Sequence, residues 1–290
     1  MKEEIRTFAE AVARYEEVLA ARDYLMHAAG PENDRDFNEV VDMLSEKGLR
    51  HRHYRHYASS ERVGNILAES AIYLTDGSSW NDEFDRERFN AKFSSSRRFG
   101  ICMSCSTVES IAMWMLYGGR NGEGAMIDFE RSSLSEAMEA RSFQFGSFDK
   151  WGRFSTSCTL ERKDIDLKLI DVVYFRLKTG DSDAYELKRF ADKETWASVS
   201  GYAFNGMQAI SKHASWSYEQ EVRLIATVKK EALGPHPLKV KCMKLPLKLS
   251  DDFTKNRVFS SPIARESLYR DSELTGTVDW DYCAGCDYRP

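Results

Sequence analysis

The amino-acid sequence predicts a mixed α+β fold, with strands and helices in irregular order rather than in repeating βαβ units. The first observation is a series of short, β-rich segments, such as AIYLT (71–75) and EVRLIATV (221–228), separated by fewer helical stretches. The second is an N-terminal segment whose apolar residues recur at helical spacing. The third is the absence of G-x-x-x-x-G-K-[ST] and of G-x-G-x-x-G after a strand, which argues against P-loop and Rossmann folds.

Residues 1–48 are predicted to form an acidic helical hairpin. Two apolar stripes mark its helices, and Gly30-Pro31 and Gly48 end them: Ile5, Phe8, Val12, Tyr15 and Leu19, then Phe37, Val40, Val41 and Leu44. The hairpin carries a net charge of −6. Packing against the rest of the chain is the favoured interpretation, and docking of a partner is the alternative.

Residues 49–270 are predicted to form the main domain. The expected strands are residues 51–57, 71–75, 98–105, 124–129, 169–175, 221–228, 237–245 and 256–262. The expected helices start at Ser60, pass through Trp114, and span residues 183–197 and 201–213. Residues 271–290 form a cysteine-containing tail with a net charge of −4, so the main domain is mildly basic, at +5.

The composition is that of a globular protein with a substantial core. The chain has 290 residues, of which 42% are hydrophobic and 30% are charged, and it includes 16 Phe, 13 Tyr and 6 Trp. No apolar run approaches the roughly 20 residues that a membrane-spanning helix needs, and MKEEIRTFAE lacks the apolar core of a signal peptide. We therefore expect a cytoplasmic protein that does not bind membranes and whose cysteines are not in disulfides.

Two C-x-x-C pairs offer a possible zinc site. Cys102 and Cys105 lie in a predicted strand, whereas Cys283 and Cys286 lie in the tail. Residues three apart in a strand point to opposite faces, which does not suit a shared metal ion. Ordinary thiols are the favoured interpretation, and no metal ligand is assigned.

The segment HRHYRHY (51–57) combines basic and aromatic side chains in one predicted strand. Such a segment can bind phosphate or stack on a base. The alternative is a solvated strand at the edge of a sheet.

A pair of carboxylates occurs in WSYEQEVRLI (216–225). Glu219 and Glu221 are separated by one residue, so a strand would place them on the same face, with Arg223 following. Paired carboxylates can stabilise a cationic transition state of the kind formed when a glycosidic bond breaks. The alternative is a surface ladder in which Arg223 pairs with the two acids.

Four segments in order resemble a large uncharacterised bacterial domain family that is often found in mobile and defence-type gene neighbourhoods. They carry the family's Y-[KR]-x-Y and aromatic-N-D-x-F-D motifs (54–85), its M-W-x-x-Y helix (100–129), its W-x-Y-E-x-E-x-R block (212–225) and its closing S-P segment (258–264). The resemblance covers roughly residues 52–270.

The same segments resemble a divergent ADP-ribosyltransferase, which implies a split β-sheet core and NAD as co-substrate. In such enzymes a His or Arg on the first strand holds NAD, an aromatic strand packs on nicotinamide, and the catalytic Glu lies late in the chain, often in E-x-E. The resemblance implies Glu221 as the catalytic residue and Glu219 as the upstream acid. It implies NAD contacts from the first strand and from the aromatic segment, namely Arg55 or His56, Tyr57, Tyr73, Trp80 and Asn81. Replacing Arg55 by Ala is then expected to weaken NAD binding without disturbing the fold.

The function implied is that of a mono-ADP-ribosyltransferase acting as a toxin or antiphage effector on RNA, DNA or protein. Such a toxin would need an antitoxin or a chaperone-type regulator, for which the acidic hairpin or the tail is a candidate docking surface. Two alternatives remain open: a non-catalytic nucleotide- or nucleic-acid-binding module of a defence system, and a zinc-dependent nucleic-acid enzyme that uses the C-x-x-C pairs.

Overall fold

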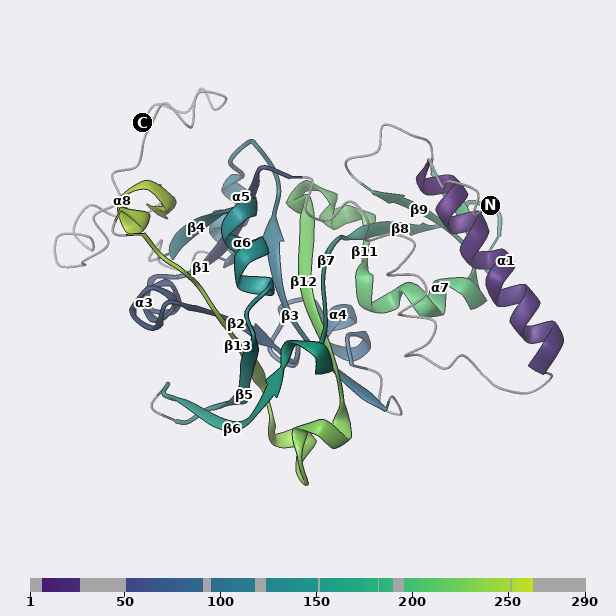
Figure 1. Ribbon diagram of the computed structural model, residues 1–290. Helices are drawn as coiled ribbons and strands as arrows, with labels where there is room; N and C mark the ends of the chain where they lie inside the picture. Colours follow the sequence, from purple (N-terminus) through teal and green to yellow (C-terminus); the bar gives the residue numbers. More distant parts are fainter. Residues whose placement is uncertain are drawn as a thin grey trace.

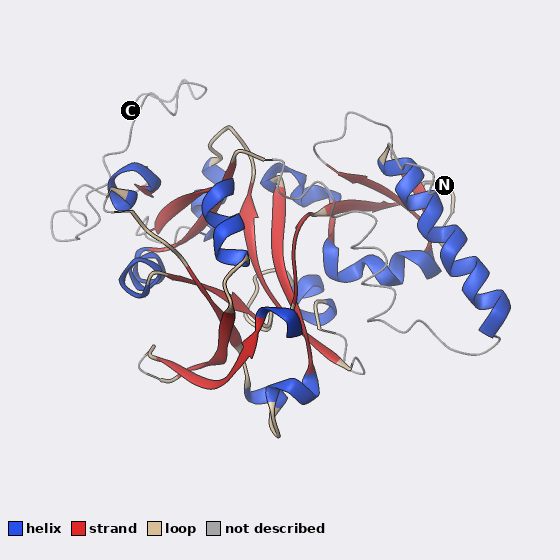
Figure 2. Ribbon diagram, viewed as in Figure 1, coloured by secondary structure: helices blue, strands red, loops and turns tan. Residues whose placement is uncertain are grey.

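The computed structural model describes residues 7–26, 51–90, 95–117, 124–150, 152–181, 183–189, 196–250 and 252–262. Within these residues, the chain forms one large ten-stranded sheet and a second sheet of four strands (Figure 1). Figure 2 shows helices distributed around both sheets rather than alternating with the strands. The predicted mixed α+β class is therefore confirmed.

The large sheet is antiparallel throughout. Its strands are β1 (His53–Ser59), β2 (Ala71–Thr75), β3 (Ser96–Ser104), β4 (Gly124–Glu130), β5 (Ser142–Phe148), β6 (Phe154–Glu161), β7 (Asp166–Asp171), β12 (Glu221–Lys229), β13 (Cys242–Pro246) and β14 (Val258–Ser260). The helices beside it are α3 (Ser60–Glu69), α4 (Glu83–Arg88), α5 (Ile111–Tyr117), α6 (Arg131–Met138) and α8 (Phe253–Arg257). Single 3₁₀ turns, η2 (Arg162–Asp164), η5 (Lys230–Leu233) and η6 (Pro237–Lys239), complete this part.

The large sheet divides along β3. On one side, β3 pairs with β12 over its whole length, and β12 pairs in turn with β7. On the other side, β1 pairs at Ser104 and β2 pairs at Gly100, so the two strands lead into separate wings, β1-β4-β14 and β2-β13-β5-β6. Gly100 is required at this junction because a Cβ there would lie 2.8 Å from the Phe89 ring. The division leaves residues 101–103 of β3 between the two wings.

The second sheet lies beside β12 and β7 and has the order β10 (Ala197–Ser200), β9 (Ala184–Arg189), β8 (Val173–Leu177) and β11 (Ser211–His213). Only β11 and β8 run parallel among these strands. The sheet packs against α1 (Phe8–Met26) and α7 (Gly201–Met207), which is followed by η3 (Gln208–Ile210). Phe8, Val12, Tyr15 and Leu19, which formed the predicted stripe, are all buried in this core. The packing interpretation is thus confirmed for the first helix.

Most predicted strands occur within a few residues of their expected ends, but the helix predicted at 183–197 is wrong. Residues 184–189 (AYELKR) form β9, which pairs with β8 and β10. Their helix-forming composition is overridden by tertiary pairing, with Leu187 buried in the core. The predicted helix 201–213 ends at Met207, and its last three residues form β11. The strand predicted at 169–175 is two strands, because the chain passes at Val172 from the large sheet into the second one.

The second helix of the N-terminal hairpin and the tail at 271–290 lie outside the described residues. The proposed domain boundaries stay predictions. Of the helices in the described ranges, none has the length and apolar character to cross a membrane.

Candidate active site

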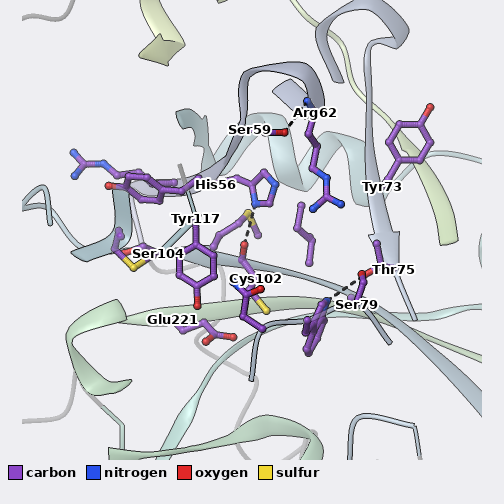
Figure 3. Close-up of a pocket in the computed structure, with 18 of the residues that line it drawn as sticks. His56, Ser59, Arg62, Tyr73, Thr75, Ser79, Cys102, Ser104, Tyr117 and Glu221 are labelled. Atoms are coloured by element: carbon purple, nitrogen blue, oxygen red, sulfur yellow. Dashed lines mark hydrogen bonds between the residues drawn. The ribbon is translucent and has the colours of Figure 1, made fainter. Parts of the chain in front are cut away.

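A cavity of about 500 Å³ lies where the large sheet divides. Its lining comes from β1, α3, β2, the segment before α4, β3 and α5, and from β11, Glu219 and the start of β12, together with Asp85 of α4 and Phe148 of β5. All eight residues assigned from the sequence line it: Arg55, His56, Tyr57, Tyr73, Trp80, Asn81, Glu219 and Glu221. Figure 3 shows Glu221, Cys102 and Tyr117 on one side of the cavity and Tyr73 on the other, with His56 and Arg62 between them.

The two carboxylates lie at the junction of η4 (Ala214–Glu219) and β12. Gln220 between them adopts a left-handed conformation, with φ 46° and ψ 54°. Glu219 and Glu221 are only 2% and 3% exposed. The surface-ladder alternative is therefore wrong, because both acids are buried beside a cavity rather than displayed on a surface.

Lys212, from β11, joins the two carboxylates. Its Nζ donates to Oε2 of Glu219 at 2.5 Å and to Oε2 of Glu221 at 2.9 Å. Tyr117, from α5, donates to the other oxygen of Glu219 at 2.7 Å. The backbone N–H of Glu221 donates to the Tyr174 hydroxyl at 2.8 Å, which holds the start of β12 in place.

Arg223 extends this cluster to α4. Its Nε donates to Oε1 of Glu221 and its Nη2 donates to Oδ2 of Asp85, both at 2.6 Å. Nη1 donates to the carbonyl of Ala209 at 2.9 Å. The guanidinium also lies 5.2 Å from the centre of the Trp80 ring, on the cavity wall. Arg223 thus does pair with Glu221, as the sequence suggested, but in the interior of the protein.

The cluster contains three acids and two cations, all buried. With every group ionised its net charge would be −1, which a low-dielectric site disfavours. Burial and the neighbouring charge of Glu221 raise the pKa of Glu219 from 4.5 to about 7. Burial likewise raises the pKa of Asp85 to about 6. Burial also opposes ionisation of Glu221, but Arg223 and Lys212 outweigh it and hold its pKa well below the usual value. The paired carboxylates therefore differ in protonation near neutral pH.

The first strand lies between β4 and β3 and is mostly buried, so the alternative of a solvated edge strand is wrong for β1. Arg55 is 1% exposed and its Nε lies 3.9 Å from the carboxylate of Asp128. His53 contacts the same carboxylate, and His51 contacts Asp171 at 2.8 Å. His51, His53 and Arg55 therefore contact carboxylates inside the protein.

His56 faces the cavity as a neutral side chain. Its Nδ1 lies 3.1 Å from the carbonyl oxygen of Cys102, and burial lowers its pKa to about 4. A carbonyl only accepts hydrogen bonds, so Nδ1 carries the proton and Nε2 is left as an acceptor. Neutral His56 therefore suits a hydroxyl or amine donor rather than the phosphate that the basic segment suggested.

Trp80 and Tyr73 both line the cavity and have different hydrogen-bond partners. Trp80 donates from Nε1 to Thr75 Oγ1 at 3.0 Å, on the Arg223 side. The Tyr73 hydroxyl donates to Glu69, and its ring packs edge-on against Phe148 at 4.8 Å between centroids. The Asn81 backbone carbonyl accepts from Arg86 at 3.4 Å. Since Tyr73 lies across the cavity from Glu221 in Figure 3, these two side chains would contact different parts of an extended ligand.

Sequence reasoning missed Lys212, Tyr117 and Asp85. Trp114 of α5 is buried, at 2% exposed, whereas Tyr117 on the same helix lines the cavity. Asp85 belongs to the N-D-x-F-D motif, in which Asp82 caps α4 through the N–H groups of Phe84 and Asp85. A lone lysine such as Lys212 carries no sequence signal of its own.

The cysteine pair in the described residues is not arranged around a metal. The Cys105 thiol donates to the carbonyl of Gln220 at 3.1 Å, and burial raises the pKa of Cys102. Within the described ranges, no group of three or more His, Cys, Asp or Glu side chains is close enough to hold a metal ion. Cys283 and Cys286 lie outside those ranges.

Comparison with known proteins locates one domain. Residues 113–224 match the model of a protein family of unknown function (DUF2971). This span contains Tyr117, Lys212, Glu219, Glu221 and Arg223, but not the first strand or Asp85. Neither the curated proteins nor the solved structures contain a match to the chain.

Proposed function

We propose that this protein is an NAD-dependent mono-ADP-ribosyltransferase that modifies a macromolecular acceptor, as a toxin or antiphage effector. The observation that carries the proposal is the pair of buried carboxylates at one cavity with pKa values displaced in opposite directions. Two acids whose environments separate their protonation states are typical of active sites that need one permanent charge and one proton acceptor.

The cavity suits an extended, multiply polar ligand such as NAD. Its volume lies within the range of small-molecule sites. Arg62 offers a cation near the first turn of α3, where Ser59 accepts from the Arg62 N–H, and His56 offers an acceptor. Tyr73 and Trp80 offer flat apolar surfaces in the lining of the cavity. The residues present therefore fit a dinucleotide, with Glu221 assigned to the nicotinamide ribose.

The two carboxylates would divide the reaction between them. The bond between nicotinamide and ribose breaks with positive charge developing on the sugar, and ionised Glu221 stabilises that charge. Its oxygens accept from Lys212 and Arg223, but a carboxylate has about four acceptor positions, so a ribose hydroxyl can still donate to it. Glu219, with a pKa of about 7, takes the proton from the acceptor's hydroxyl or amine as the new bond forms on the ribose.

The test is to incubate the protein with NAD labelled in its ADP-ribose part and with cell lysate, and then to separate RNA, DNA and protein. The expected result is release of nicotinamide together with label in one of the three fractions. NAD binding without nicotinamide release would instead indicate the non-catalytic binding module. No release under any condition, with the protein folded, would overturn the proposal.

A further inference from the structure

Lys212 occupies a position that the two-carboxylate mechanism does not by itself require. It comes from β11 in the second sheet, whereas Glu221 begins β12 in the large sheet. Its side chain is 5% exposed, and its ammonium lies 4.9 Å from the centre of the Trp216 ring. One ammonium therefore contacts both carboxylates at the wall of the cavity.

We propose that Lys212 is a positioning residue that holds Glu219 and Glu221 side by side and keeps Glu219 able to ionise. The catalytic consequence rests on the proposed function, but the electrostatic role does not. Two carboxylates that share a site cannot both ionise without a nearby cation, because like charges at such distances repel strongly. Lys212 supplies this cation from a different sheet, so the docking of the second sheet completes the pair.

Within the part of the chain that the structure describes, few other sources of positive charge surround Glu219. The titratable groups that act on it come from every element packed there: Lys212 on β11, Glu221 on β12, Tyr117 on α5, and Tyr174 and Tyr218 nearby. Arg223 contacts Glu221 and Asp85 rather than Glu219. Of the groups that contact Glu219 directly, Lys212 is the cation and Tyr117 is a neutral donor.

Lys212 does not act as a nucleophile. The charges of Glu221 and Glu219 outweigh its burial and raise its pKa well above the ordinary value, so it stays an ammonium. With Lys212 neutralised, the cluster would hold three acids against one cation. Glu219 would then keep its proton to higher pH and would no longer accept one at neutral pH.

The experiment compares Lys212→Gln, which keeps a hydrogen-bond donor but removes the charge, with Lys212→Arg, which keeps the charge. Glutamate labelled with ¹³C at the carboxyl is titrated by NMR, and Glu219→Gln identifies the Glu219 signal. We expect the wild-type Glu219 midpoint well above 4.5, a midpoint at least about one pH unit higher in the Gln variant, and a near wild-type value in the Arg variant. Lys248→Met, which removes an exposed lysine paired with Glu136 on α6, is the control and should leave the midpoint unchanged.

The acidic limb of the pH profile for ADP-ribose transfer to the acceptor should move with the NMR midpoint of Glu219. An unchanged midpoint in Lys212→Gln would overturn the proposal. If that variant does not fold, Lys212→Arg still decides, because a Glu219 midpoint that rises by about one pH unit although the positive charge is kept would overturn the proposal. Absence of nicotinamide release in the wild type would overturn the proposed function. The NMR titration would still test the electrostatic role of Lys212, because it does not depend on activity.

Discussion

Replacing Glu221 by Gln separates binding from chemistry in the proposed active site. The substitution keeps the shape of the side chain but removes its negative charge. In the wild type the carboxylate accepts hydrogen bonds from Arg223 at 2.6 Å and from Lys212 at 2.9 Å. The remaining cluster then has two cations, balanced by Glu219 and Asp85, so its formal net charge changes from −1 to zero. Because no buried cation is left without an acid, we expect the variant to fold.

The expected loss is in turnover. Glu221 interacts most strongly with charge that appears only as the glycosidic bond breaks, so the ground-state affinity for NAD should change by less than about threefold. Removing one preorganised electrostatic group typically lowers the rate about 100- to 1,000-fold, which corresponds to about 3–4 kcal/mol of barrier. The pKa of Glu219 should also fall, because the Glu221 charge that helps to raise it is gone.

The assay measures nicotinamide release and label transfer at saturating NAD, with NAD affinity measured separately by calorimetry. Glu136→Gln is the matched control, because Glu136 has a half-exposed side chain that is paired with Lys248 on the surface. It should behave as the wild type in all three measurements. A Glu221→Gln protein that releases nicotinamide at the wild-type rate would refute the assignment of Glu221.

Three further predictions follow from the same contacts. The Glu219 carboxyl keeps its proton to a pH of about 7 in the folded protein but only to about 4.5 when unfolded, so wild-type stability falls between these values as pH rises. As the pH rises from 4.5 to 8, the free energy of unfolding of Glu219→Gln, measured with urea, should therefore increase by up to about 3 kcal/mol relative to that of the wild type. A difference in unfolding free energy that does not change with pH would contradict this. Tyr117→Phe removes a hydrogen bond that lowers the pKa of Glu219, so the acidic limb of the pH profile for transfer should move to higher pH by about one unit. An unchanged pH profile would show that this hydrogen bond does not affect the active site. Arg55→Ala leaves the buried carboxylate of Asp128 without its guanidinium neighbour, so we now expect it to lose about 3–5 kcal/mol of stability in urea unfolding, in contrast to the intact fold expected from the sequence.

Local patterns were sufficient for most elements of the fold. β2 was predicted at its observed ends, and β12 was predicted to within one residue, because both are short runs of β-formers. The prediction for the segment AYELKR was wrong for the opposite reason. Its residues favour helix, and it forms a strand because it pairs with β8 and β10. Strand pairings between distant segments override weak local preferences and cannot be read from the segment alone.

The sequence motifs identified residues that line the cavity, but they did not identify the residues that pair with them. Motif order was enough to nominate residues from 55 to 221, and the structure brings all of them to one cavity. The contacts that set their chemistry join elements far apart in the chain, as between Asp85 and Arg223 or between Tyr117 and Glu219. Such contacts depend on how the second sheet and α5 pack beside β12, which no spacing in the sequence encodes.

The cluster also explains why three separate motifs end in polar residues. N-D-x-F-D ends in Asp85, M-W-x-x-Y ends in Tyr117, and Y-E-x-E-x-R supplies two acids and Arg223. The apolar members of the first two motifs, Phe84 and Trp114, pack against hydrophobic clusters, while the polar members meet around the two carboxylates. A buried cluster with unequal numbers of acids and cations costs stability relative to a packed apolar core. Its location on a cavity wall, with one acid titrating near neutral pH, therefore favours a chemical role over a purely structural one.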